Sequence, residues 1–209
     1  MKKGKIVIID YGMGNLGSIQ NILRHVGADS IVSSLPSDIE SADKLILSGV
    51  GAFDSAVKKI HDMALLSVLS EQVLENKIPI LGICLGMQLF TTKSEEGELP
   101  GFGWIEGKTV KFRFDTELQK LKIPHMGWNI VHPRKESKLF HNMPEGPRFY
   151  FVHSYHVLCK NQEDVLCVTH YGYDFGSAIE KDNIYGTQFH PEKSHKFGMQ
   201  LVKSFTELV

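Results

Sequence analysis

The sequence predicts an α/β fold with a mostly parallel central sheet, flanking helices and a small antiparallel β insertion. Short aliphatic runs, typical of strands buried on both faces, occur at residues 5–9, 44–47 and 78–83. Residues 16–26 and 53–75 lie between these runs and carry apolar side chains at helical spacing. Strands that alternate with helices in this way form βαβ units, whose strands are parallel.

The middle of the chain has a different pattern. Residues 97–135 contain many glycines and prolines, and their apolar residues alternate, which predicts short antiparallel ribbons and loops. The remaining elements are expected to be four strands and a final helix, at 148–152, 165–169, 177–179, 184–188 and 194–208. No repeat or low-complexity linker divides the chain, so we expect a single domain over residues 1–209.

Composition excludes several classes of function. The formal net charge of −1 provides no global field that would attract nucleic acid or an anionic membrane. No window approaches the roughly 18 apolar residues of a membrane span, and the apolar run at 6–9 is too short for a secretory signal. Cys84, Cys159 and Cys167 form no CxxC pair, which argues against a disulfide framework or a zinc site. We expect a cytoplasmic protein without metal or cofactor.

Cys84 is the first candidate for catalysis. Residues 82–86 read GICLG, a G-x-C-x-G pattern at a predicted strand-to-helix turn, which is the cysteine version of a nucleophile elbow. A helix beginning at Leu85 would direct free N–H groups at the sulfur and favour the thiolate. Free cysteine is also a common core residue, so this pattern alone does not separate a nucleophile from packing.

His190 and Glu192 are the candidate base and its orienting carboxylate. They follow the strand predicted at 184–188, at the same edge of the sheet as Cys84. If Pro191 keeps the backbone extended, the two side chains project to the same side and complete a nucleophile–base–orienter arrangement. The alternative is that His-Pro-Glu is only a turn. An oxyanion hole is available from the N–H groups of Leu85 and of Val50, which lies between two glycines.

The stretches at 82–88 and 188–192 together resemble the class I, or triad, glutamine amidotransferases, and the resemblance covers nearly the whole chain. Residues 9–15, 124–129 and 150–155 are closer to one branch of that family, the glutaminase subunits of imidazole glycerol phosphate synthase. The resemblance implies a flavodoxin-like fold and no cofactor.

The resemblance also implies roles for individual residues. Cys84 would attack the side-chain amide of glutamine, His190 would protonate the departing ammonia and then activate water, and Glu192 would orient His190. Glutamine would bind at Gly51, Gln88, Ser154 and Tyr155. The ammonia would pass to a separate (β/α)₈ cyclase subunit, with which the chain would form a heterodimer in histidine biosynthesis.

The partner is expected near the rim of the sheet, at Asn15, Trp128 and Lys193. Each residue has a simpler explanation: Asn15 as a helix cap, Trp128 as core filling and Lys193 as a solvated lysine.

Three other functions remain open from the sequence. A paralogous glutaminase subunit would supply ammonia to an amidotransferase that modifies surface sugars. A stand-alone γ-glutamyl hydrolase or peptidase would need no partner. A non-catalytic binding module would have to use the loop at 11–15, which lacks the third glycine of a dinucleotide fingerprint.

Overall fold

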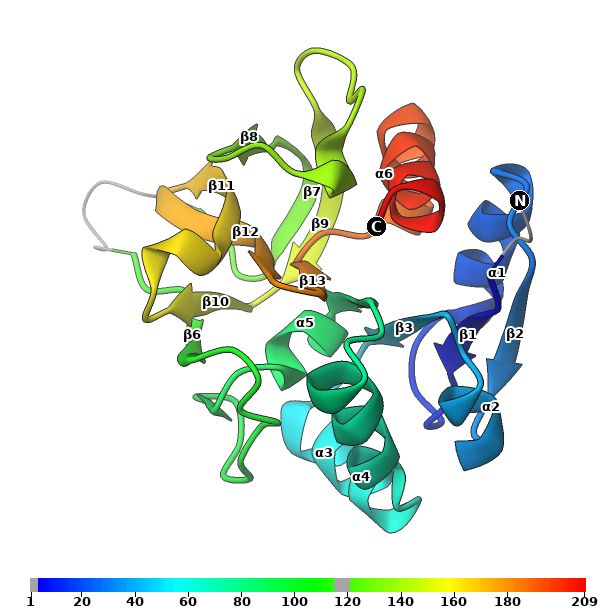
Figure 1. The fold of residues 1–209 in the computed structure, drawn as a ribbon. Helices are drawn as coiled ribbons and strands as arrows, with labels where there is room; N and C mark the ends of the chain where they lie inside the picture. The colour runs from blue at the N-terminus through cyan, green and yellow to red at the C-terminus, as the bar shows by residue number, and fades with distance from the viewer. Residues whose placement is uncertain (1–3, 115–120) are drawn as a thin grey trace.

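The computed structural model describes residues 4–114 and 121–209. The centre of the molecule is a sheet that contains eleven strands within these residues, and five of them form its parallel part (Figure 1). Their order is β2 (Ser30–Ser33), β1 (Ile6–Ile9), β3 (Lys44–Gly49), β4 (Ile80–Cys84) and β13 (Ile184–Thr187). This is the flavodoxin-like order, in which ligands bind beyond the carboxyl ends of the strands. The predicted parallel core is confirmed.

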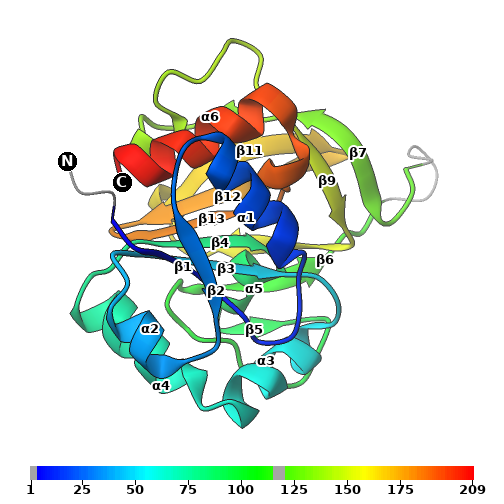
Figure 2. The same cartoon turned by 90° about the vertical axis from the view of Figure 1, so that its right-hand side faces the viewer.

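Helices cover both faces of the parallel strands (Figure 2). One face carries α1 (Leu16–His25) and α6 (His195–Glu207), and the other carries α2 (Pro36–Glu40), α3 (Phe53–Asp62) and α4 (Leu65–Ser70). None of the helices in the described part of the chain is long and apolar enough to cross a membrane.

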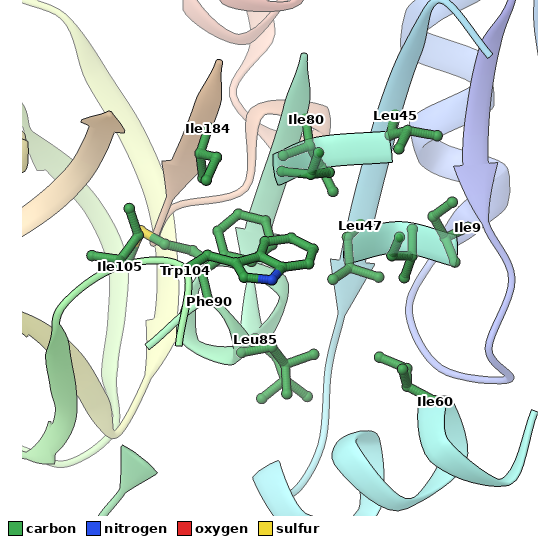
Figure 3. Packing of buried hydrophobic residues seen from close by; sticks show 14 of the residues in the cluster. Ile9, Leu45, Leu47, Ile60, Ile80, Leu85, Phe90, Trp104, Ile105 and Ile184 are labelled. Carbon is green, nitrogen blue, oxygen red and sulfur yellow. The ribbon is translucent and has the colours of Figure 1, made fainter. Parts of the chain in front are cut away.

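The two helical layers explain why the strands are continuously apolar. On β1, Val7 and Ile9 pack into the core under α3 and α4, whereas Ile6 and Ile8 pack against α1 and α6. Successive side chains of a strand point to opposite faces, so each face needs its own apolar set. Figure 3 shows the first of these cores, which includes Ile9, Leu45 and Leu47 from the strands and Ile60 from α3.

The antiparallel strands are largely a continuation of the central sheet. β12 (Tyr173–Lys181) pairs antiparallel with β13 and extends the sheet through β10 (Tyr155–Cys159), β6 (Gly107–Lys111) and β5 (Lys93–Ser94). β11 (Val165–Tyr171) pairs with β12 and with β8 (His132–Pro133). β7 (His125–Ile130) and β9 (Arg148–His153) form a separate antiparallel pair. The predicted antiparallel region therefore exists, and its strands β6 and β8 belong to the same sheet as the parallel core, to which β12 connects them, whereas β7, among the described strands, pairs only with β9.

Several predicted boundaries are wrong. The single helix expected at 53–75 is divided, because Ala64 adopts a left-handed conformation with φ +53° between α3 and α4. A π turn, η1 (Glu71–Glu75), then continues α4. The residues around Ala64 include no glycine or proline that would predict this break. After it, Leu65 and Leu69 of α4 are fully buried. Helix α2 and strand β10 were not predicted.

Short 3-10 turns complete the described part of the fold: η2 (Lys138–Phe140), η3 (Gln162–Asp164) and η4 (Pro191–Lys193). Part of the loop region predicted at 97–135, residues 115–120, lies outside the described residues.

Candidate active site

Cys84 lies at a strained strand-to-helix turn. It is the last residue of β4 and has φ +55° and ψ −110°, and the next residue begins the short helix α5 (Leu85–Leu89). A non-glycine residue at positive φ is energetically costly and is concentrated at functional sites. This geometry is that of the predicted elbow.

The glycines of the elbow are required by close packing. A Cβ on Gly86 would lie 1.8 Å from the carbonyl oxygen of Leu47, and a Cβ on Gly82 would lie 2.5 Å from the ring of Phe90. Neither glycine is at positive φ. Their role is therefore to let α5 sit directly against β3 and β4, which holds Cys84 at the carboxyl edge of the sheet.

His190 and Glu192 form a buried pair. His190 Nδ1 lies 2.7 Å from Glu192 Oε1, and each side chain is 2% exposed. The prediction that Pro191 keeps this segment extended is wrong, because residues Pro191–Lys193 form the 3-10 turn η4. The turn nevertheless brings the two side chains together, so the expected pairing stands for a different geometric reason.

The ring of His190 is electrostatically coupled to Cys84. Burial lowers the pKa of His190, but the side-chain contacts with Cys84 and then with Glu192 outweigh it and raise this pKa to about 10. Because Nδ1 faces Glu192, the other ring nitrogen, Nε2, is the one available to Cys84. Among the described residues, Nε2 has no partner within hydrogen-bonding geometry. The arrangement favours an imidazolium beside the sulfur.

A pocket of about 360 Å³ opens beside Cys84, within the size range of small-molecule sites. Its walls bring together all of the predicted oxyanion and glutamine-binding residues: Val50, Gly51, Leu85, Gln88, Ser154 and Tyr155. A larger surface groove of about 980 Å³, between Lys135 and Tyr185, contains none of these residues. The individual roles of the pocket residues remain predictions.

The predicted oxyanion turn is exposed to this pocket. Val50 is 46% exposed and Gly51 has φ +114°, a conformation that favours glycine. A Cβ on Gly49 would lie 2.1 Å from the hydroxyl oxygen of Tyr11, so the turn packs closely against that buried ring. Leu85, the second predicted donor, is the first residue of α5.

Gln88 belongs to a polar network that reaches the nucleophile. Its Nε2 donates to the Tyr155 carbonyl oxygen at 3.1 Å and to Gln188 Oε1 at 3.0 Å. Gln188 Nε2 in turn lies 3.6 Å from Cys84 Sγ. Gln188 was not predicted as a site residue, although it begins the stretch that contains His190.

The pocket also contains residues for which no role was expected: Glu96, Pro124, Val152 and His153. Glu96 accepts a hydrogen bond from the backbone N–H of Phe53 at 3.1 Å, and burial raises the pKa of its carboxyl group. Pro124 and His153 lie in the two stretches that carried the closer resemblance. No sequence pattern predicts a role for Glu96, because it lies in an irregular segment.

The three predicted interface residues lie at the surface. Asn15 Oδ1 accepts a hydrogen bond from the N–H of Ser18 at 3.3 Å and therefore caps α1. Trp128 is 45% exposed and stacks on His195, so the core-filling alternative is wrong. Lys193 Nζ lies 5.7 Å from the ring centroid of Tyr150. Trp128 also contacts Tyr150 edge-on, which places it beside Lys193 on one surface.

The other two cysteines are poor nucleophiles. Burial raises the pKa of Cys159 to about 12 and that of Cys167 well above its usual value. Neither lines the pocket beside Cys84. Among the described residues, no group of three or more His, Cys, Asp or Glu side chains is placed to hold a metal ion.

Comparison with known proteins identifies close relatives. The family model described as glutamine amidotransferase class-I matches residues 7–208. The chain is 53% identical to imidazole glycerol phosphate synthase subunit HisH 2 of Methanococcus maripaludis, over 96% of this chain and 98% of that protein. It is 49% identical to imidazole glycerol phosphate synthase subunit HisH 2 of Pseudomonas aeruginosa, over 98% of this chain and 100% of that protein.

Solved structures share the fold at lower identity. The match to a putative GMP synthase subunit from Thermoplasma acidophilum covers 99% of this chain and 94% of that chain, with a TM-score of 0.71 at 22% identity. The match to PurLQS from Thermotoga maritima covers 97% of both chains, with a TM-score of 0.69 at 16% identity.

Proposed function

Because this chain belongs to the class-I glutamine amidotransferase family, we propose that it is the glutaminase subunit of an imidazole glycerol phosphate synthase. It hydrolyses glutamine to glutamate and ammonia, and it passes the ammonia to a (β/α)₈ cyclase subunit in histidine biosynthesis. The observation that carries the proposal is that Cys84 lines the pocket while the buried His190 contacts Cys84 on one side and pairs with Glu192 on the other.

The triad supports acyl transfer in two steps. In the first, the Cys84 thiolate bonds to the side-chain carbonyl carbon of glutamine, the C–N bond breaks, and the proton on His190 Nε2 goes to the leaving group, which departs as ammonia. In the second, His190 takes a proton from water, the water oxygen attacks the γ-glutamyl thioester, and the C–S bond breaks. Glutamate leaves, and the thiolate–imidazolium pair is restored.

The surroundings suit this chemistry. Val50 and Leu85 line the pocket, and in this mechanism their N–H groups would stabilise the oxyanion; Gly51, Gln88, Ser154 and Tyr155, which line the same pocket, would bind glutamine. The carboxylate of Glu96 in the same pocket complements the α-ammonium group of an amino-acid substrate.

Replacing Cys84 tests the proposal directly. Cys84→Ala should abolish glutamine hydrolysis and labelling by a thiol-reactive glutamine analogue, and its complex with the cyclase subunit should still form product from added ammonium. Cys159→Ala is the matched control and should keep hydrolysis. Substantial glutamine hydrolysis by Cys84→Ala would refute the triad.

A second acceptor is favoured by one observation. Both relatives named above carry the numeral 2 in their names, which favours a second subunit of this kind beside a first. A paralogue that supplies ammonia to a surface-sugar amidotransferase has the same triad and a different partner. Co-purification of the chain from its source, with identification of the bound subunit, separates the two acceptors. A stand-alone hydrolase would instead show full activity with no partner.

A further inference from the structure

The two histidines of residues 124–129 and 150–155 are not used by the proposed triad, but they contact each other. His125 lies on β7 and His153 on β9, and each is at most 6% exposed. His125 Nδ1 lies 2.9 Å from His153 Nε2. The ring of His125 is stacked between Tyr171, with ring centroids 4.0 Å apart, and Phe151, at 4.7 Å.

Both rings are held neutral. Burial lowers the pKa of His125 to about 4 and lowers that of His153 well below its usual value. A neutral imidazole carries one ring proton, so it donates from one nitrogen and accepts at the other. The hydrogen-bond partners therefore decide which nitrogen carries each proton.

The partners allow one assignment. His153 Nδ1 lies 2.7 Å from the carbonyl oxygen of Tyr155, which can only accept, so His153 carries its proton on Nδ1. His153 Nε2 must then accept from His125 Nδ1, and His125 Nε2 must accept from a further donor. That donor is Asn129 Nδ2, at 3.3 Å.

The orientation of the Asn129 amide is fixed independently. Its Oδ1 accepts the backbone N–H of Ile130 at 2.8 Å, and its Nδ2 also donates to the His170 carbonyl oxygen at 2.9 Å. In each hydrogen bond from Asn129 to Tyr155, the donor thus lies on the Asn129 side and the acceptor on the Tyr155 side. The hydrogen bonds run from the exposed strand β7 to the wall of the glutamine pocket.

We propose that Asn129, His125 and His153 form a directional hydrogen-bond relay, in which the two histidines are positioning residues for glutamine binding. The relay holds the carbonyl of Tyr155, which also accepts from Gln88, and so fixes the Ser154–Tyr155 wall beside Cys84. It begins on the strand whose outward side chains, Met126, Trp128 and Ile130, are 45–62% exposed. This inference rests on the proposed glutaminase function.

His125 gives the sharper kinetic test, because it does not line the pocket. His125→Leu should raise the KM for glutamine about fivefold to tenfold in the complex with the cyclase subunit, with kcat changed less than about twofold. In His125→Asn, the amide nitrogen can occupy the place of Nδ1 and donate to His153. This variant should restore the KM to within about twofold of the wild-type value.

His156 offers a matched control. It is a buried histidine that contacts the ring of Phe112, as His125 and His153 do, but its Nε2 lies 2.9 Å from the Tyr173 hydroxyl oxygen and it takes no part in the relay. His156→Leu should lower the melting temperature as His125→Leu does and leave the KM unchanged. Equal KM values for His125→Leu, His156→Leu and wild type would overturn the proposal, as would a failure of His125→Asn to rescue.

A second measurement needs no variant and no activity. Long-range ¹H–¹⁵N NMR of the wild-type chain at neutral pH should show both His125 and His153 as neutral rings with the proton on Nδ1. A proton on Nε2 of His153, or an imidazolium at either position, would overturn the relay. This outcome is distinct from failure of the glutaminase function itself, which the Cys84→Ala variant reports.

Discussion

His190 and Glu192 are joined by a 2.7 Å contact between Nδ1 and Oε1 in a site from which both side chains are almost fully excluded from water. The backbone of His190 is fixed on both sides, because its N–H donates to the Tyr150 carbonyl oxygen at 2.9 Å and its carbonyl oxygen accepts from Ser194 Oγ at 2.6 Å. Ser194 Oγ also accepts the N–H of Tyr150 at 3.0 Å. The backbone of His190 is thus held from strand β9, and its ring is held by Glu192.

This arrangement predicts that substitutions of His190 and of Glu192 have unequal effects. His190→Ala should reduce kcat/KM for glutamine by about 10³-fold or more, because it removes the proton donor and acceptor of both steps. Glu192→Gln should cost about 10-fold to 100-fold, since an amide oxygen can still accept from Nδ1. Steady-state glutaminase kinetics measure both effects. Negligible losses in both variants would mean that residues 190–192 are only a turn.

The alkaline limit of activity should follow His190. Its pKa is raised to about 10, since the contacts with Cys84 and Glu192 outweigh the lowering by burial. The imidazolium therefore persists at neutral pH, and the proton needed by departing ammonia is lost as the pH rises through this pKa. Glu192→Gln removes a negative charge that stabilises the imidazolium, so the alkaline limb of kcat/KM should move to lower pH. A limb that stays in place or moves to higher pH would contradict this coupling.

Gly86 should be intolerant of even one added carbon. Gly86→Ala would place its Cβ 1.8 Å from the Leu47 carbonyl oxygen, so α5 must move away from β3. We expect a loss of about 1–3 kcal/mol in the free energy of unfolding, measured with urea, and a loss of glutaminase activity. Gly17→Ala is the control, because Gly17 is an exposed residue of α1 with no atom within 4 Å of an added Cβ, so this variant should keep or raise stability.

The surface beside Tyr150 should be required for coupling to the partner. Trp128→Ala or Lys193→Ala should lower the partner-stimulated glutaminase rate, because each removes a large exposed group from that surface. Both variants should keep their melting temperature and the reactivity of Cys84 towards a glutamine analogue. Leu35→Ala, an exposed apolar residue at the start of α2, is the control and should be stimulated normally. Normal stimulation of Trp128→Ala and Lys193→Ala would place the docking surface elsewhere.

The sequence by itself determined the parallel core and the elbow. The aliphatic runs of β1, β3 and β4 and the periodicity of α1 are local patterns, and a strand buried on both faces must be apolar throughout. The G-x-C-x-G pattern at 82–86 likewise predicted a strand-to-helix turn at Cys84. Such features depend on residues within a few positions of each other, so they can be read along the chain.

The tertiary structure alone decided several contacts between residues that are distant in the sequence. Gln188 lies near Cys84 because β13 pairs with β4, and His125 contacts His153 because β7 and β9 pair in one register. His190 is extended, as expected before a proline, but the 3-10 turn that begins at Pro191 was not predicted, and His190 is tied there to β9 and Ser194 by its N–H and carbonyl groups. Strand order and register arise from the packing of the whole sheet, and no local pattern carries them.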